Sequence, residues 1–184
     1  MTTVNFITFD LETTDSNPST CWPVSLTAKV CDNDLKPIDL VSFYIQAPEV
    51  SKEGALAVHG ITQEFLRTRG VSNPVAAKKW NSLIWKYAPV VILGYNCINF
   101  DVPVIMRLCK EYPKNPAFPW PPVMAVADVM FLAQWQFQMK GWPKLKETVD
   151  RLGIPSDPEK FHDAEYDVEM TWKCFVKLTE KWRL

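Results

Sequence analysis

The spacing of apolar residues predicts a chain that begins with strands and continues with alternating helices and strands. Five stretches have the length and pattern of strands: 4–11, 25–32, 39–46, 90–94 and about 123–128. The second and third are joined by a short link with the turn residues Asn33, Asp34 and Pro37, so the first three predict an antiparallel meander. The stretch 90–94 is continuously apolar, as expected of a central strand covered on both faces.

Helical spacing of apolar residues fills most of the remaining chain. Two short helices, each ended by a glycine, are expected around 54–60 and 61–70. Longer helices are expected at 72–87, 100–112, 129–138, 145–152 and 163–182, with a proline-rich loop at 113–122. Trp85 and Trp172 have helical spacing and are expected in the core. The order of elements predicts an α/β fold in which helices flank a mixed sheet.

Length and composition are those of an ordinary globular protein. The chain has 184 residues, of which 47% are hydrophobic and 22% are charged, so we expect a single domain over 1–184. No apolar run is long enough to span a bilayer, and the start does not resemble a signal peptide. A cytoplasmic or nuclear location is therefore expected.

Cysteine, histidine and net charge narrow the possible chemistry. The five cysteines are scattered without a CxxC motif and are expected to be reduced and buried. The two histidines, His59 and His162, are too few for a histidine-rich metal centre. Because the net charge is −1, a nucleic-acid partner would have to be held by local contacts.

Two carboxylates, Asp10 and Glu12, interrupt the first predicted strand. Strand side chains alternate, so both acids point to one face while Ile7, Phe9 and Leu11 point to the other. Like charges on a mostly buried strand repel each other and lose hydration. This strand therefore needs a cationic partner.

Asp101 is also an acid at a position expected to face the protein interior. On its predicted helix it shares a face with Ile105, Leu108 and Tyr112. A charge there is unfavourable unless it is paired or bound to a cation. A cap of its own helix is an equally weighted alternative.

Asp167 lies in the first turn of the last predicted helix, at the border of the apolar stripe. A first-turn acid favoured by the helix dipole is the alternative interpretation. His162 precedes it by five residues, in a loop before the helix. A lone histidine is more often a surface residue than a functional one.

Together, these acids predict a metal site. A sheet flanked by helices can bring Asp10, Glu12, Asp101 and Asp167 to one point, and oxygen-only ligands favour Mg²⁺ or Mn²⁺. Two such ions about 4 Å apart could clamp the attacking and leaving oxygens of a phosphodiester. His162 would then be the base that takes a proton from the attacking water.

Three motifs resemble those of the DEDDh exonucleases, the DnaQ-like branch of the ribonuclease-H-like superfamily. FDLETT resembles the first motif, GYNCINFD the second, and HDAEYD the third, with the family's five-residue separation of His162 and Asp167. They occur in the family's order across nearly the whole chain. The resemblance implies a five-stranded mixed sheet and the removal of mononucleotides from a 3′ end by two-metal hydrolysis. We expect Asp10 to be the ligand that bridges the two ions.

The same resemblance implies contacts with the substrate. AVHGIT resembles the segment beside the terminal nucleotide, although His59 could equally be a helix-end residue with a structural hydrogen bond. The positions that match substrate-binding or neighbouring residues are Leu11, Thr13, Thr14, Val58, His59 and Asn96. Asp128 matches the strand-to-helix passage and is expected to cap a helix.

Some residues depart from the family pattern or have a possible role in substrate binding. Asp15 stands where many relatives carry glycine, and SLTAKV lacks the acid often present in the second strand. Trp22, Trp120 and Trp142 fall in loops, where an indole could stack on a base, although packing is favoured for each. A basic stretch could meet phosphates, although a solvated helix face is favoured: Lys140, Lys144, Lys146 and Arg151.

The overall prediction is a freestanding 3′–5′ exonuclease acting on the 3′ ends of DNA or RNA, with DNA slightly favoured and single strands expected. The alternatives are an oligoribonuclease-type enzyme that trims RNA, a proofreading subunit, and a binding module without catalysis. The intact set of four acids and His162 argues against the last. Several family members dimerise, but no residue pattern here marks an interface.

Overall fold

A five-stranded mixed sheet forms the centre of the computed structural model, which describes residues 3–112 and 123–180. The strands, in the spatial order β3-β2-β1-β4-β5, are β1 (Asn5–Thr13), β2 (Pro23–Cys31), β3 (Pro37–Tyr44), β4 (Val90–Gly94) and β5 (Val123–Asp128). Neighbours among β1, β2 and β3 pair antiparallel, whereas β4 pairs parallel to both β1 and β5. The predicted fold class is confirmed.

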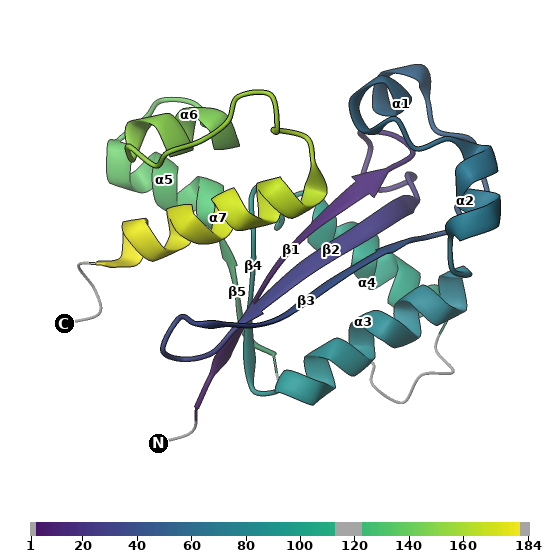
Figure 1. Cartoon of the computed structure of the whole chain (residues 1–184), viewed down its shortest axis with the longest axis horizontal. Helices are drawn as coiled ribbons and strands as arrows, with labels where there is room; N and C mark the ends of the chain where they lie inside the picture. Colours follow the sequence, from purple (N-terminus) through teal and green to yellow (C-terminus); the bar gives the residue numbers. More distant parts are fainter. Residues whose placement is uncertain (1–2, 113–122, 181–184) are drawn as a thin grey trace.

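The helices cover both faces of this sheet (Figure 1). They are α1 (Glu53–His59), α2 (Gln63–Arg69), α3 (Asn73–Tyr87), α4 (Asp101–Glu111), α5 (Val129–Phe137), α6 (Leu145–Arg151) and α7 (Ala164–Thr179). Helices α3 and α4 pack on one face, and α7, with α5 and α6 beside it, lies over the other. Figure 1 also shows α1 and α2 grouped at the end of the sheet towards which β1 points.

Side chains alternate along β1, so one face of the strand belongs to the core and the other carries the two acids. Ile7, Phe9 and Leu11 are buried in the core cluster to which α3 and α4 contribute, and the Phe9 ring lies 4.9 Å from that of Trp80. On the other face, Phe6 packs against two aromatic rings of α7. That second face continues through Thr8 to the two acids, so β1 presents carboxylates at its carboxyl end.

Trp172 is only 5% exposed, as predicted, but Trp85 is 49% exposed and the prediction for it is wrong. The buried stripe of α3 includes Trp80 and Ile84. Trp85 lies one residue beyond Ile84 and is therefore turned about 100° away from it.

Three further expectations concern the cysteines, membrane-spanning helices and the segments outside the described residues. All five cysteines are buried and free, as predicted. No helix in the described part of the chain is long and apolar enough to cross a membrane. The predicted loop 113–122, with Trp120, and the predicted helix end at Trp182 lie outside the described residues.

Candidate active site

Four acids predicted from sequence lie close to one another at the carboxyl ends of β1 and β4. Asp10 and Glu12 lie in the second half of β1, Asp101 is the first residue of α4, and Asp167 lies in the first turn of α7. Burial raises the pKa of Asp10 well above its usual range, and the charges of the other three acids raise it further. The fold therefore brings the three sequence motifs together.

Burial also raises the pKa of each of the other three acids. For Glu12, burial and then the charges of Asp167 and Asp163 raise the pKa to about 7. For Asp167, burial raises the pKa to about 6, although the backbone N–H of His162 opposes the shift. Burial likewise raises the pKa of Asp101. None of the ion pairs between described residues includes any of the four acids.

Asp101 does not cap its own helix, which was one interpretation of its sequence position. The residue at the N-cap of α4 is Phe100, whose side chain makes no capping hydrogen bond. Asp101 is 5% exposed, and its Oδ1 accepts a hydrogen bond of 3.2 Å from the backbone N–H of Leu11. This bond ties the start of α4 directly to the acidic part of β1.

His162 lies in the turn that leads into α7, as predicted. Its backbone has φ of 76°, a left-handed conformation that is uncommon for a residue with a side chain. The backbone N–H of His162 donates to Asp167 Oδ2 at 3.1 Å, and Asp163 caps α7 by accepting from the N–H of Tyr166. The histidine and the last acid are therefore held together by the cap of α7.

A small hollow of about 180 Å³ lies beside the acids. Its lining includes Glu12, His59 and His162, together with the strand residues Ser25 and Thr27. His59 is the last residue of α1, and its Nδ1 accepts a hydrogen bond of 2.9 Å from the N–H of Ile61. Burial lowers the pKa of His59, with partial opposition from the Thr13 backbone. The predicted structural hydrogen bond is present, and both histidines face one hollow.

The other residues predicted to bind substrate differ in how accessible they are. Val58 is 53% exposed on α1, whereas the Leu11 side chain is buried. The Thr13 hydroxyl donates to the carbonyl of Asp15, and the Thr14 hydroxyl donates to Glu49 and accepts from the N–H of Trp22. In this structure, the two hydroxyls stabilise the loop that follows β1.

Asp128 caps α5, as predicted, and it also holds a second segment, which the sequence did not indicate. Its carboxylate accepts hydrogen bonds from the backbone N–H groups of Met130, Asn96 and Ile98. Asn96, a predicted substrate contact, is half-buried and has φ of 58°. Asp128 thus fixes the loop between β4 and α4 that leads to Asp101.

The acids fit a hard divalent cation by the chemistry of their donor atoms. They supply only carboxylate oxygens, and Asp167 Oδ1 is buried without a hydrogen bond from any described residue. No three His, Cys, Asp or Glu side chains in 3–112 and 123–180 are already grouped as the ligands of one ion. Carboxylates without a cation between them repel each other, and a bound cation would remove that repulsion.

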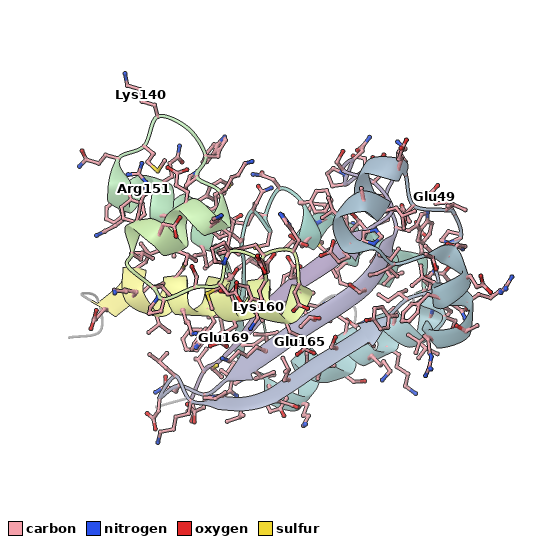
Figure 2. The ribbon with its side chains drawn as sticks, turned by 45° about the horizontal axis from the view of Figure 1, so that its top comes forward. Glu49, Lys140, Arg151, Lys160, Glu165 and Glu169 are labelled. Carbon is pink, nitrogen blue, oxygen red and sulfur yellow. The ribbon has the colours of Figure 1, made fainter. Side chains whose placement is uncertain are left out.

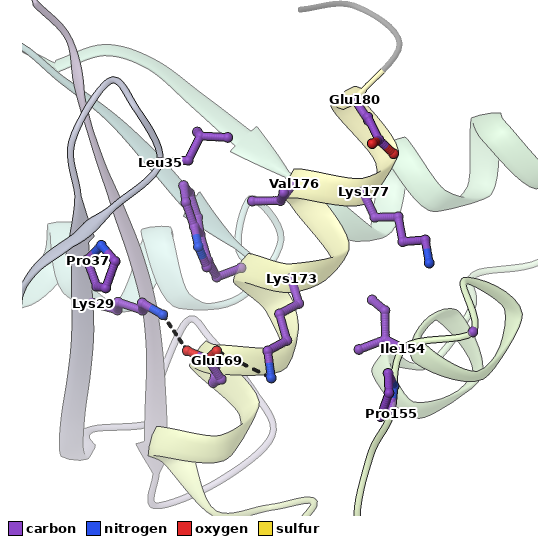
Figure 3. Close-up of a pocket in the computed structure, with 12 residues that line it drawn as sticks. Lys29, Leu35, Pro37, Ile154, Pro155, Glu169, Lys173, Val176, Lys177 and Glu180 are labelled. Carbon is purple, nitrogen blue, oxygen red and sulfur yellow. Dashed lines mark hydrogen bonds and ion pairs between the residues drawn. The ribbon is translucent and has the colours of Figure 1, made fainter.

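A larger hollow lies elsewhere on the described part of the chain. It has a volume of about 970 Å³. Its lining comes from α7 between Glu169 and Lys177, from the turn between β2 and β3, and from residues 153–155. Figure 3 shows Lys29 and Lys173 reaching Glu169 from opposite sides in this hollow. Trp172 also lines it, and none of the four acids does.

Comparison with known proteins identifies the class of this chain. A family model described as Exonuclease, RNase_T, matches residues 7–175, so the chain belongs to this exonuclease family. The predicted family is confirmed. A curated relative is the PolC-type DNA polymerase III of Mycoplasma genitalium, which is 24% identical over 92% of this chain and 11% of that protein.

Two solved structures share the fold over almost the whole chain. E. coli Exonuclease I in complex with a dA16 oligonucleotide has a TM-score of 0.79 and 24% identity, covering 97% of this chain and 41% of that one. The same enzyme in complex with a 5cy-dT13 oligonucleotide has a TM-score of 0.82 and 23% identity, covering 98% and 41%. The chain thus spans less than half the length of these relatives.

Proposed function

We propose that this chain is a metal-dependent 3′–5′ exonuclease that releases nucleoside monophosphates from single-stranded 3′ ends, with DNA favoured over RNA. The observation that carries the proposal is the group of four carboxylates on an exonuclease fold, with no lysine or arginine of the described residues paired to them. The relatives support DNA as the polymer, because Exonuclease I has been captured with DNA oligonucleotides. The proposal treats 1–184 as one domain.

Each residue of the site has a role in this proposal. Asp10, Glu12, Asp101 and Asp167 would hold two Mg²⁺ or Mn²⁺ ions, which supply Lewis-acid stabilisation of the charge that develops on the phosphate. His162 would take the proton from the attacking water at an imidazole nitrogen. Its backbone bond to Asp167 supports that role, because it keeps the imidazole near the acids.

Substrate contacts form the second part of the proposal. Val58 would contact the last base, since it is exposed on α1 next to His59. We assign contacts near the terminal nucleotide to the remaining family-matched residues: Leu11, Thr13, Thr14, His59 and Asn96. The hydroxyls of Thr13 and Thr14 already have partners, so their contribution would be to shape the loop beside the acids.

The test is digestion of 5′-labelled single-stranded DNA and RNA of equal sequence with Mg²⁺ or Mn²⁺. We expect a ladder that shortens from the 3′ end, faster on DNA, and that disappears with chelator or in Asp10→Ala. Asp34→Ala is the matched control, because Asp34 is an exposed acid in the turn at the opposite end of the sheet. Faster digestion of RNA would favour the oligoribonuclease-type alternative. Intact label with folded protein in every lane would favour the binding module.

A further inference from the structure

A short segment after α5 combines positive charge with an exposed aromatic ring. Residues 138–146 contain three lysines and no acid, in a chain with a net charge of −1. The three lysines are exposed, and none forms an ion pair with a described residue. Trp142, which lies among them, is 61% exposed. We call these residues the α5–α6 strip: Lys140, Trp142, Lys144 and Lys146.

The indole of Trp142 is held in place although it is exposed. Its ring packs against Phe131 with centroids 5.1 Å apart and planes tilted by 52°. The next residue, Pro143, is buried, and its carbonyl accepts a hydrogen bond of 2.8 Å from the Tyr95 hydroxyl. That hydroxyl also contacts the Thr148 hydroxyl at 2.6 Å. The strip is thus anchored at its centre, and the indole keeps an open surface.

The contacts that anchor the strip also hold the loop that leads to Asp101. Tyr95 directly follows β4 and begins that loop. Asp128 binds the N–H groups of Asn96 and Ile98 and caps α5, the helix that carries Phe131. In Figure 2, Lys140 extends from the side of the molecule formed by α5 and α6, whereas Glu49 lies on the side of α1. The loop between β4 and α4 therefore joins the anchor of the strip to the start of α4, where Asp101 lies.

Exposure distinguishes Trp142 from tryptophans that serve packing. Trp80 is fully buried, and Trp172 is 5% exposed. An indole that is 61% exposed leaves most of its apolar surface in water, so it gains little of the stabilisation that burial would give. An exposed and rigidly held aromatic ring among unpaired lysines matches the usual elements of a single-strand binding surface.

We propose that the α5–α6 strip binds the nucleotides that precede the terminal one on a single strand. Trp142 stacks on an unpaired base, and the lysines contact phosphates. Because the chain as a whole is slightly acidic, this attraction is local and holds the strand only near the site. The inference rests on the proposed function and extends it, since it makes a single strand of several nucleotides the preferred substrate.

The first test measures binding without cleavage. A fluorescein-labelled DNA strand of about 12 nucleotides is titrated in chelator. We expect Trp142→Ala to weaken binding about tenfold, in the lower half of the range for loss of one stacked base. Trp85→Ala is the matched control, since Trp85 is 49% exposed near the end of α3, which joins the opposite end of the sheet. Equal affinity of Trp142→Ala and wild type would overturn the proposal.

The salt dependence of binding tests the lysines independently of Trp142. Each phosphate contact contributes about 0.7 to the slope of log affinity against log salt for single strands. We therefore expect the triple variant Lys140→Ala, Lys144→Ala and Lys146→Ala to lower the slope by about 2. Lys36→Ala, at an exposed position in the β2–β3 turn, should keep the wild-type slope. A wild-type slope in the triple variant would count against the strip.

Turnover of strands of different length separates this inference from the proposed function. The wild type is expected to prefer the long strand over a dinucleotide, and Trp142→Ala to lose about tenfold of that preference through KM. A variant that keeps the full preference would overturn the inference while leaving the exonuclease intact. If wild type cleaves neither substrate, the proposed function is wrong, and the binding comparison still decides whether the strip holds nucleic acid.

Discussion

Glu12 links the charge of the candidate site to the stability of the protein without metal. Burial and the nearby charges of Asp167 and Asp163 raise its pKa from 4.5 to about 7. The folded state therefore binds this proton more tightly than the unfolded state, and the carboxylate form destabilises the fold. This destabilisation is absent below pH 4.5 and complete above about pH 7, so stability falls as pH rises through that window. At about 1.4 kcal/mol per pH unit, the shift corresponds to roughly 3 kcal/mol at most.

The perturbation is Glu12→Gln, which keeps the shape of the side chain and removes its charge. In chelator, urea unfolding should give a variant that is about 1–3 kcal/mol more stable than wild type above pH 7. Near pH 4, where the wild-type side chain is protonated, the two should be equally stable. Glu64→Gln, on the exposed surface of α2, is the control and should show no such gain.

Two results would refute this reasoning. One is a Glu12→Gln variant that is less stable than wild type above pH 7, because Glu12 would then have a stabilising cationic partner. The other is a gain in stability that does not change with pH, which would assign the effect to packing instead of charge.

Three further predictions concern other parts of the site. His162→Ala should slow turnover by about 10²–10⁴-fold while Mn²⁺ binding persists, and near-normal turnover would remove His162 as the base. Reversing either charge of the Asp15–Lys52 ion pair should raise KM about two- to fivefold by loosening α1, and the double reversal should restore KM; additive losses would show that the pair is unimportant. Asp128→Ala should lower the free energy of unfolding by about 2–4 kcal/mol, because three backbone N–H groups lose their acceptor. Unchanged urea unfolding would contradict a stabilising role for these three hydrogen bonds.

The fold could be predicted because its signals are local. The alternation along β1, the apolar run of β4 and the glycine-ended helices each depend on neighbouring residues. The spacing along α3 wrongly predicted that Trp85 is buried. A single helix offers several apolar faces, and only tertiary packing decides which one is buried. The stripe through Trp80 and Ile84 is the one that meets β1.

The sequence predicted which acids form the candidate site, but not the hydrogen bonds that hold them in place. Asp101 and Asp128 look alike in sequence, as acids at strand-to-helix passages. In the structure, Asp128 accepts three backbone hydrogen bonds, whereas Asp101 accepts one from Leu11. The hydrogen bonds that Tyr95 and Thr14 make to distant segments left no signal in the sequence, because they depend on long-range pairing of chain segments.

The most direct test of the account is a titration of the metal-free protein with Mn²⁺, following free Mn²⁺ by electron paramagnetic resonance. The account predicts saturable binding of two ions in wild type, a large loss of that binding in Asp10→Asn, and wild-type binding in the control Asp34→Asn. No saturable binding in wild type, or equal binding in Asp10→Asn, would contradict the claim that these four carboxylates form a divalent-metal site.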